Sequence, residues 1–475
     1  MNDEPQLLGE AVASPTKEFF VSMLTRDIAL QDAILDLLDN CVDGILRSPN
    51  FNSSDPKPYA NYQATIKLSP DHFEIVDNCG GIPLETAKQY AFAMGRPRVA
   101  EVDATPATVG MYGIGMKRAI FKIGTNALVE SRNDIGFSVE FTPTWMASDN
   151  WDSLPIRQID ADKLAAGGTS ITVMTLNQEV VSAFKDSEWI DEFRKTIARH
   201  YSIIIEKGFS VLVGNGGANA TPIVAEPFRL LRTALDEGKA IAPFAYTGTL
   251  GDVDVEIYAG LYRELLNSEE ADQEEETRGS ADDAGWTVAC NDRVVVWKDK
   301  TRLTGWGEAT VPNYHGQFIA ITGIVLLHCD DPRKLPLTTT KRGIDAASNV
   351  YSEAKDLMRE ATKNLTSFTN RWKKFPEKLE TIYLASEYVS LPALRAMPAT
   401  VEMVTVRKLP TMMRFEPHYP EPEQQNTHVV VKFDALKEDV ALVGKAYFGD
   451  DEAPKPGDVG REALARAAKT LRDEI

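Results

Sequence analysis

DLLDNCVDG, residues 36–44, lies inside a longer stretch, residues 19–47, whose apolar side chains recur about every 3.6 positions. This period predicts a helix. Asp36, Asn40 and Asp43 stand at positions i, i+4 and i+7, so they share one face of it. An exposed helix face is the ordinary interpretation. The narrowness of the polar stripe favours a site instead, since a carboxylate can orient or deprotonate water and an amide oxygen suits Mg²⁺.

Asp27 is the expected N-cap of this helix, and a β-hairpin is expected after it. Residues 63–68 and 72–76 alternate polar and apolar side chains on either side of Ser69-Pro70-Asp71. Alternation around a turn sequence of this kind is typical of two paired strands.

The second strand of the hairpin leads into IVDNCGGI, residues 75–82. Asp77 stands at the end of the strand, and Gly80 and Gly81 follow. Glycine permits the close approach of a flat ligand to the backbone, and a carboxylate beside it can accept a hydrogen bond from an exocyclic amine. An ordinary Asp-Asn turn is the alternative.

A glycine-rich segment, GMYGIGMKRA, occupies residues 110–119 and precedes a helix-like run. Backbone N–H groups at a helix N-terminus favour phosphate, and Lys117 adds a positive charge there. The spacing matches neither the Walker pattern nor the dinucleotide fingerprint. A fourth, weaker element is Gly167-Gly168-Thr169, which opens an expected strand.

Composition indicates a globular protein of two or three domains, since the chain has 475 residues, 43% of them hydrophobic. The formal net charge of -19 argues against broad affinity for nucleic acid or anionic membrane, although it leaves a local basic groove open. We find neither an apolar run long enough to span a membrane nor a signal-peptide pattern. The four cysteines lack paired ligand spacing, which argues against zinc and fits a reducing cytoplasm.

Three domains are expected along the chain. Residues 1–225 hold the elements above, and residues 226–345 are strand-rich, with a like-charged acidic stretch at 268–283 that is typical of a disordered loop. Residues 346–475 form a helical C-terminal region, with a long basic helix over 350–380 and another helix from about residue 459. By elimination, this third region is the expected contact with a protein partner.

Taken together and in this order, the four elements resemble the GHKL ATPase superfamily, which includes the DNA gyrase B subunit, ninety-kilodalton heat-shock chaperones, histidine kinases and MutL-type repair proteins. Microrchidia (MORC) ATPases have a related site. The resemblance spans roughly residues 14–213. It implies the α+β class: a Bergerat-fold sandwich with helices on one face of a mixed sheet, then a smaller transducer-like domain and the helical C-terminal region.

The resemblance implies ATP and Mg²⁺ as cofactors. Asn40 would bind Mg²⁺, Asp36 would be the general base, Asp77 and Thr169 would contact adenine, and the loop from Met94 to Gly115 would cover the phosphates. The implied nucleotide contacts are Asn40, Asp43, Asp77, Gly81, Met94, Gly110, Gly113, Ile114, Gly115, Met116, Lys117 and Thr169.

LPLTTTK, residues 335–341, resembles the transducer loop of the gyrase, chaperone, MutL and MORC branch, in which a lysine reaches the γ-phosphate. Lys341 is the matching residue, and a solvated loop lysine is the alternative. The chain departs from the family twice. Asp36 replaces the usual glutamate, which sets its carboxylate about 1.5 Å further back. Cys79 stands where the adenine motif usually has glycine.

The expected function is an ATP-hydrolysing conformational switch, in which ATP drives domain closure or homodimerisation on an unknown protein or nucleic-acid client. A MORC-like or bacterial defence ATPase fits the chain length. The alternative is a nucleotide-binding structural or signalling module with little turnover, which Asp36 motivates. A protein kinase is disfavoured because the first histidine, His72, follows the helix of residues 36–44. A topoisomerase and a full chaperone are disfavoured by the remaining sequence and length.

Overall fold

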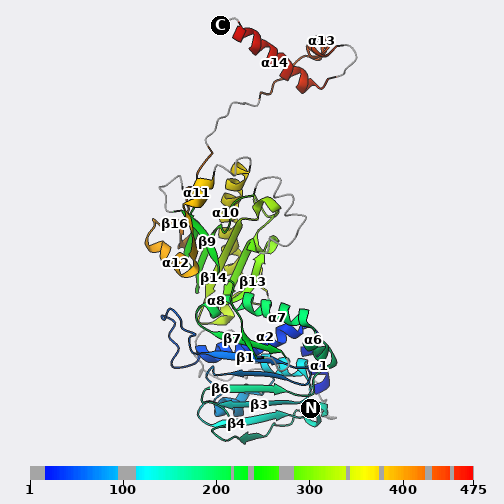
Figure 1. The fold of residues 1–475 in the computed structure, drawn as a ribbon, viewed down its shortest axis with the longest axis vertical. Helices are drawn as coiled ribbons and strands as arrows, with labels where there is room; N and C mark the ends of the chain where they lie inside the picture. Colours follow the sequence, from blue (N-terminus) through cyan, green and yellow to red (C-terminus); the bar gives the residue numbers. More distant parts are fainter. Residues whose placement is uncertain are drawn as a thin grey trace, which may run out of the picture. The chain divides into compact units, whose positions relative to one another are not determined.

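The chain divides into two compact units, Met1–Pro422 and Glu423–Ile475. Two mixed sheets and the helices around them build the first unit, which confirms the α+β class (Figure 1). The computed structural model describes residues 16–94, 114–215, 219–233, 240–266, 283–338, 343–373, 379–422, 431–449 and 454–473.

The first sheet has eight strands in the order β5-β4-β3-β6-β2-β1-β7-β8. The β1–β2 pair is the expected antiparallel hairpin, and β1 also pairs in parallel with β7, so the sheet is mixed. Its strands are β1 (Gln63–Leu68), β2 (Phe73–Asp77), β3 (Ala127–Arg132), β4 (Gly136–Phe141), β5 (Ile156–Gln158), β6 (Gly168–Val173), β7 (Ser210–Asn215) and β8 (Thr221–Pro222).

One face of this sheet carries the first hydrophobic core. Along β1, Ala64, Ile66 and Leu68 are buried, whereas the alternate residues Gln63 and Lys67 are exposed, as the period of two residues in a strand requires. The helices of this part are α1 (Lys17–Arg26), α2 (Leu30–Leu46), α3 (Leu84–Thr86), the π-helical turn η1 (Ala87–Ala91), α4 (Gly115–Ile123), α5 (Pro143–Ala147), α6 (Gln178–Lys185), α7 (Ser187–His200) and α8 (Ser202–Glu206).

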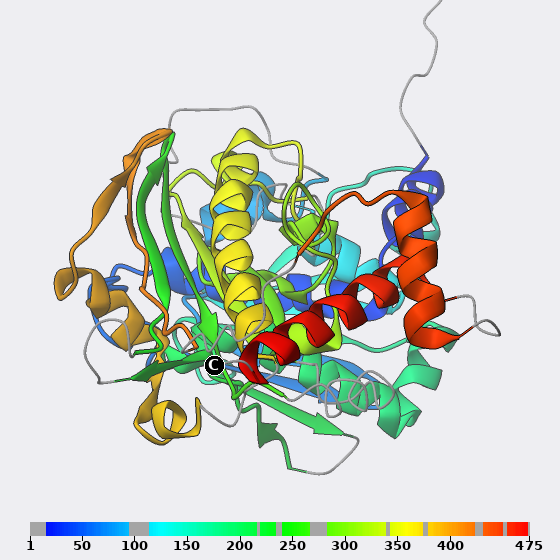
Figure 2. The same ribbon diagram turned by 90° about the horizontal axis from the view of Figure 1, so that it is seen from above.

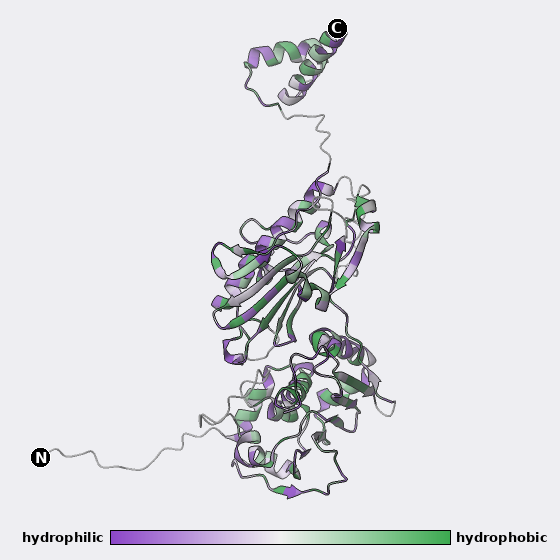
Figure 3. Ribbon diagram, turned by 90° about the vertical axis from the view of Figure 1, so that its left-hand side faces the viewer, coloured by the Kyte–Doolittle hydropathy of each residue, from purple (hydrophilic) through white to green (hydrophobic). Residues whose placement is uncertain are grey.

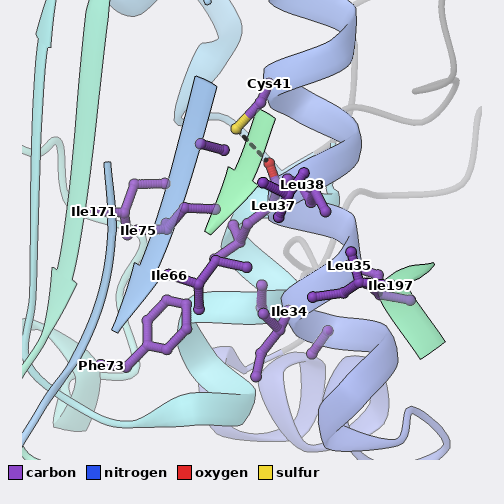
Figure 4. Packing of buried hydrophobic residues seen from close by; sticks show 14 of the residues in the cluster. Ile34, Leu35, Leu37, Leu38, Cys41, Ile66, Phe73, Ile75, Ile171 and Ile197 are labelled. Carbon is purple, nitrogen blue, oxygen red and sulfur yellow. Dashed lines mark hydrogen bonds between the residues drawn. The ribbon is translucent and has the colours of Figure 1, made fainter. Parts of the chain in front are cut away.

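Helix α2 lies deepest in the first core. Its leucines and isoleucines pack against Ile66, Ile75 and Ile171 of three neighbouring strands and against Ile197 of α7 (Figure 4). Almost every α2 side chain from Ala33 to Leu46 is buried, so this helix is held from several directions rather than along one stripe. A polar residue on α2 therefore lies in a fixed, largely dry environment.

The helix expected over residues 19–47 is two helices, and the predicted N-cap is wrong. Asp27 ends α1 as its C-cap, while Ala29 precedes α2 and offers no side-chain cap. The break has a packing reason, because Ile28 between the helices is buried in the first core. The apolar repeats that predicted the helix lie within α2, so they did not indicate where it begins.

The second sheet has seven strands in the order β13-β12-β14-β11-β10-β17-β16, with β12 and β14 parallel and the other pairs antiparallel. Its strands are β10 (Phe244–Leu250), β11 (Val253–Leu261), β12 (Gly285–Cys290), β13 (Arg293–Asp299), β14 (Ile321–His328), β16 (Val404–Val406) and β17 (Leu409–Phe415). A separate two-stranded sheet pairs β9 (Arg229–Thr233) with β15 (Ser386–Ser390). Figure 3 shows the apolar character of the second sheet's strands.

Helix α10 (Asn349–Trp372) packs across β10, β11 and β14 and belongs to the second core (Figure 2). Tyr351, Leu365 and Trp372 along its length are all buried there. Residues 346–422, which were expected in a separate C-terminal region, thus complete the second core. The shorter helices here are η3 (Arg302–Thr304), η4 (Gly316–Phe318), η5 (Pro332–Lys334), α11 (Glu380–Leu384), α12 (Leu391–Ala396) and η7 (Met397–Ala399).

The second unit contains α13 (Lys437–Phe448) and α14 (Pro456–Asp473), which pack against each other. The helical character expected from about residue 459 is present, and α14 begins three residues earlier. Within the described residues of the whole chain, none of the helices combines the length and apolar character that crossing a membrane requires.

Candidate functional site

The loop after β2 lies directly against α2. A Cβ built on Gly44 of α2 would stand 2.4 Å from the carbonyl oxygen of Cys79, and one built on Gly80 would stand 3.0 Å from the carbonyl oxygen of Gly44. This approach of the two backbones leaves no room for a Cβ at Gly44. The glycine that ends the DLLDNCVDG stretch therefore has a packing role, which is to bring the two strongest sequence motifs together.

Asp77 lies at this junction, at the end of β2. Its Oδ1 accepts a hydrogen bond from the backbone N–H of Cys79 at 2.8 Å, and its Oδ2 accepts one from the thiol of Cys41 at 3.3 Å. Burial raises the pKa of the Asp77 carboxyl to about 6, although these hydrogen bonds oppose the shift. The side chain is held in place at the inner wall of the sheet.

Thr169 is the cross-strand neighbour of Asp77, because β6 pairs with β2 in that register. The Thr169 hydroxyl lies 3.0 Å from that of Ser131 on β3, and Ser131 in turn accepts from the backbone N–H of Ile82 at 2.8 Å. Gly81 adopts a φ of +68°, and a Cβ there would stand 2.5 Å from the Arg132 carbonyl oxygen. The two expected adenine-contact segments thus form one continuous wall.

The N-terminus of α4 lies against the first half of α2. A Cβ on Gly115 would be within 3.6 Å of the Asp36 side chain. Arg118, one turn along α4, donates to Asp36 Oδ2 from Nη2 at 2.5 Å and from Nε at 3.1 Å. Both side chains are largely buried, with 12% and 4% exposed. The expected general base is therefore held in a close ion pair.

Lys117 points away from that pair. Its side chain is buried, and its ammonium group donates to the Ala91 carbonyl oxygen at the end of η1, at 2.8 Å. Burial lowers the pKa of this amine to about 8. Met94 and Met116 are partly buried and pack against the first core beside it. Lys117 thus ties α4 to the segment that precedes the glycine-rich loop.

Asn40 and Asp43 complete the polar face of α2. Asn40 is partly exposed, whereas Asp36 and Asp43 are each 3% exposed. Asp43 lies within electrostatic reach of Tyr59, whose pKa is raised by burial first and then by Asp292 and Asp43. Oxygen donors of this kind suit Mg²⁺ chemically. Asn40 is the most exposed of the three, so it is the residue that could contact a metal–phosphate group from solvent.

Several expected site residues lie outside the described residues: Gly110, Gly113, Lys341 and most of the segment from Met94 to Ile114. The acidic residues 268–282 lie outside them as well. Ile114, which is described, directly precedes α4. The structure thus brings together the expected residues of α2, residues 77–81, β6 and α4.

Helix α2 also contacts the second sheet, through Asp39. Arg293, the first residue of β13, donates to Asp39 Oδ1 at 2.9 Å, and Tyr201 donates to the same oxygen at 2.5 Å. The guanidinium group of Arg293 also lies 4.3 Å from the centre of the Tyr201 ring. Asp39 stands three residues after Asp36 and four before Asp43, so this contact lies on the same side of α2 as the polar residues of the candidate site.

A second buried contact reinforces this junction. The β12–β13 turn holds Asn291 and Asp292 at positive φ, 46° and 65°. Asp292 accepts from Lys207 at 2.6 and 2.7 Å and from the Tyr59 hydroxyl at 3.1 Å. Burial opposes ionisation, yet Lys207 and then His328 hold the pKa of the Asp292 carboxyl below its ordinary value. Two ion pairs therefore hold one turn of the second sheet against the first part of the chain, which consists of the first sheet and its helices.

Sequence reasoning missed three features of this region. Arg118 lies inside the glycine-rich motif, where its spacing after Gly115 is a usable signal once α4 is recognised. The Asn291-Asp292 turn is a recognisable hairpin signal, but nothing local points to its partner. Cys41 and Cys79 are close in space although the sequence gives them no paired ligand spacing.

No protein-family model matches the chain, and no curated protein matches it either. The geometry of the residues is therefore what carries a functional conclusion.

Proposed function

We propose that this chain is an ATP-binding conformational switch of the GHKL type, with a Bergerat-fold first part and a transducer-like second part. The observation that carries the proposal is the meeting of segments far apart in sequence: residues 77–81 and the N-terminus of α4 both contact α2, and Thr169 on β6 lies beside Asp77. Glycine-rich turns that matched these motifs by chance would not be expected to lie together in the fold.

Adenine binding is assigned to the wall formed by Asp77, Gly81 and Thr169. The Asp77 carboxylate accepts a hydrogen bond from the exocyclic amine of adenine, and the glycine backbone leaves room for the flat ring. A hydroxyl at Thr169 supplies a further polar contact beside the carboxylate. Asp77 is partly buried, which strengthens any such hydrogen bond because the local dielectric is lower than that of water.

Phosphate binding is assigned to the start of α4 and to Asn40. The N–H groups in the first turn of α4 lack helical acceptors and favour an anion. Asn40 would hold Mg²⁺ through its amide oxygen, and the metal would offset phosphate charge. The Lys117 ammonium has three N–H donors, so it can contact a phosphate with a donor other than the one that binds Ala91.

The Asp36–Arg118 pair favours slow turnover. A carboxylate that binds a guanidinium group is a weak base toward water, because taking up a proton would destroy the ion pair. Asp36 acts as the general base once Arg118 turns toward the phosphates. The second candidate function, a nucleotide-binding module with little turnover, corresponds to a chain in which this pair stays closed.

Coupling to the second part runs through α2. Nucleotide contacts at Asn40 and the Arg293 contact at Asp39 are made by adjacent residues. A ligand shifts a conformational equilibrium only by its different affinity for the two states. In this proposal Lys341 adds a contact to the γ-phosphate that exists in the closed state alone. ATP-dependent homodimerisation and a protein client bound by residues 423–475 extend the proposal.

The first test is calorimetric titration of the full chain with a non-hydrolysable ATP analogue, with and without Mg²⁺. We expect Mg²⁺-dependent binding that Asp77→Asn weakens strongly. Asp71→Asn is the matched control, because Asp71 is an exposed aspartate in the β1–β2 turn. Absence of binding to folded wild-type protein overturns the proposal.

Turnover is tested separately by phosphate release. Wild-type protein should release phosphate slowly and Asp36→Asn should not. If the two are equally inactive while the analogue still binds, the module with little turnover is the correct function.

A further inference from the structure

Two cysteines and a carboxylate meet beneath the proposed adenine wall. Cys41 lies on α2 and Cys79 in the loop after β2, and the two sulfur atoms and an oxygen of Asp77 all lie within 4.8 Å of one another. Both cysteines are buried, with 4% and 1% exposed. Within the described part of the chain, this is the one group of three such ligands close enough to hold a metal ion.

We propose that Cys41, Cys79 and Asp77 form a binding site for a thiophilic divalent cation of the Zn²⁺ class. Zinc binds thiolate at about 2.3 Å and carboxylate at about 2.1 Å, so ligand atoms around a tetrahedral ion lie roughly 3.8 Å apart. Side-chain rotations that move the ligand atoms by about 1 Å bring the three atoms to that spacing. The mutual contact of Gly44 with Cys79 already holds the two backbones together.

Charge and proton balance are consistent with this chemistry. On binding, each thiol forms a sulfur–metal bond and releases one proton to solvent, while the Asp77 carboxylate binds through Oδ2. The thiol of Cys41 now donates to that oxygen, so the metal replaces an existing hydrogen bond. Three anionic ligands around a dication leave one net negative charge, and a water molecule completes the coordination.

The effect on nucleotide follows from Asp77, and this step rests on the proposed function. Oδ1 of Asp77 already accepts from the Cys79 backbone N–H. When Oδ2 binds a metal, the carboxylate can no longer accept the exocyclic amine of adenine well. Metal and ATP therefore weaken each other's binding by the same factor. A rise in the concentration of free Zn²⁺ would thus weaken ATP binding and oppose the conformational change.

The experiment is a titration of reduced, metal-free full-length protein with Zn²⁺ alone, in competition with a chromophoric chelator. We expect one ion per chain. Cys41→Ser and Cys79→Ser should each lower the affinity by about a hundredfold or more, since even outer-shell changes cost 10- to 100-fold. Cys290→Ser is the matched control, a buried cysteine of the second core. Co²⁺ in place of Zn²⁺ should give thiolate charge-transfer bands that both variants lose.

The proposal is overturned if the wild-type protein does not bind Zn²⁺, or if Cys41→Ser and Cys79→Ser bind Zn²⁺ with the same affinity as the wild type. Circular dichroism verifies that each variant folds, and Cys79→Gly provides a second replacement at the loop position. The metal titration contains no nucleotide, so its result is independent of the ATP proposal. Competition is measured last: Zn²⁺ should weaken binding of the ATP analogue in wild type and not in Cys79→Ser.

Discussion

Arg293 of the second sheet and Asp39 of α2 form an ion pair at 2.9 Å in which each side chain is only 2% exposed. Asp39 is the residue before Asn40, so the pair ends one residue from the expected Mg²⁺ ligand. Buried pairs of this kind are costly to break, because removal of one partner strands the other charge.

Arg293→Ala should therefore lower the free energy of unfolding by about 3–5 kcal/mol. Chemical denaturation, followed by tryptophan fluorescence, measures the change. The double variant Asp39→Leu, Arg293→Met should recover most of the loss, because no charge is left buried. Arg371→Ala removes a solvent-exposed pair with Glu421 and should have a much smaller effect. Similar losses in Arg293→Ala and Arg371→Ala would contradict the assigned role.

Asp77 should give the protein a specific pH dependence. Its pKa is raised from 3.8 to about 6 in the folded chain, so the folded state keeps a proton that the unfolded state releases between these values. Its contribution to stability is thus present below pH 3.8 and is lost as pH rises through about 6. Denaturation across this range, compared with Asp77→Asn, isolates the effect.

Binding of adenosine should show the opposite trend, strengthening as pH rises through about 6 and Asp77 ionises. Adenosine is the suitable ligand because it carries no phosphate to titrate. An affinity that is flat across this range would rule out the Asp77 carboxylate as the acceptor.

Gly44→Ala should separate α2 from the loop after β2. The added Cβ meets the Cys79 carbonyl oxygen at 2.4 Å. The two nearest atoms both belong to the Cys79 backbone, so the loop must move. Overpacking of this kind costs about 1–3 kcal/mol. Binding of the ATP analogue should weaken with it, as calorimetry would show. Gly457→Ala, which meets nothing within 4 Å, should leave nucleotide affinity unchanged.

Asp36→Glu should accelerate phosphate release. The longer side chain advances the carboxylate by about 1.5 Å and disturbs the present geometry with Arg118. Since a displacement of about 1 Å can change a rate roughly a hundredfold, a gain of tenfold or more is expected. Binding of the non-hydrolysable analogue should change little. A glutamate variant no faster than wild type would show that Asp36 is not the base.

The local patterns predicted local structure well. Alternation gave the β1–β2 hairpin, with β1 at the predicted residues 63–68. The 3.6-residue period correctly predicted the helix that carries Asp36, Asn40 and Asp43, while their role as a site stays a prediction. The break at Asp27 was missed, because burial of Ile28 depends on a core that the sequence does not display.

Long-range pairing was beyond sequence reasoning. Strand β17 joins the second sheet beside β10, whose residues lie far earlier in the chain. The partners of Arg118 and Arg293 were missed for the same physical reason: the partner of a buried charge is selected by the tertiary fold, and the local sequence does not identify it.

The Asp39–Arg293 pair also restricts how this protein can be recombined. A second part without an arginine at residue 293 would leave the Asp39 carboxylate buried without its counterpart, and a first part without an acidic side chain at residue 39 would do the same to Arg293. An exchange of either part therefore has to keep both charges.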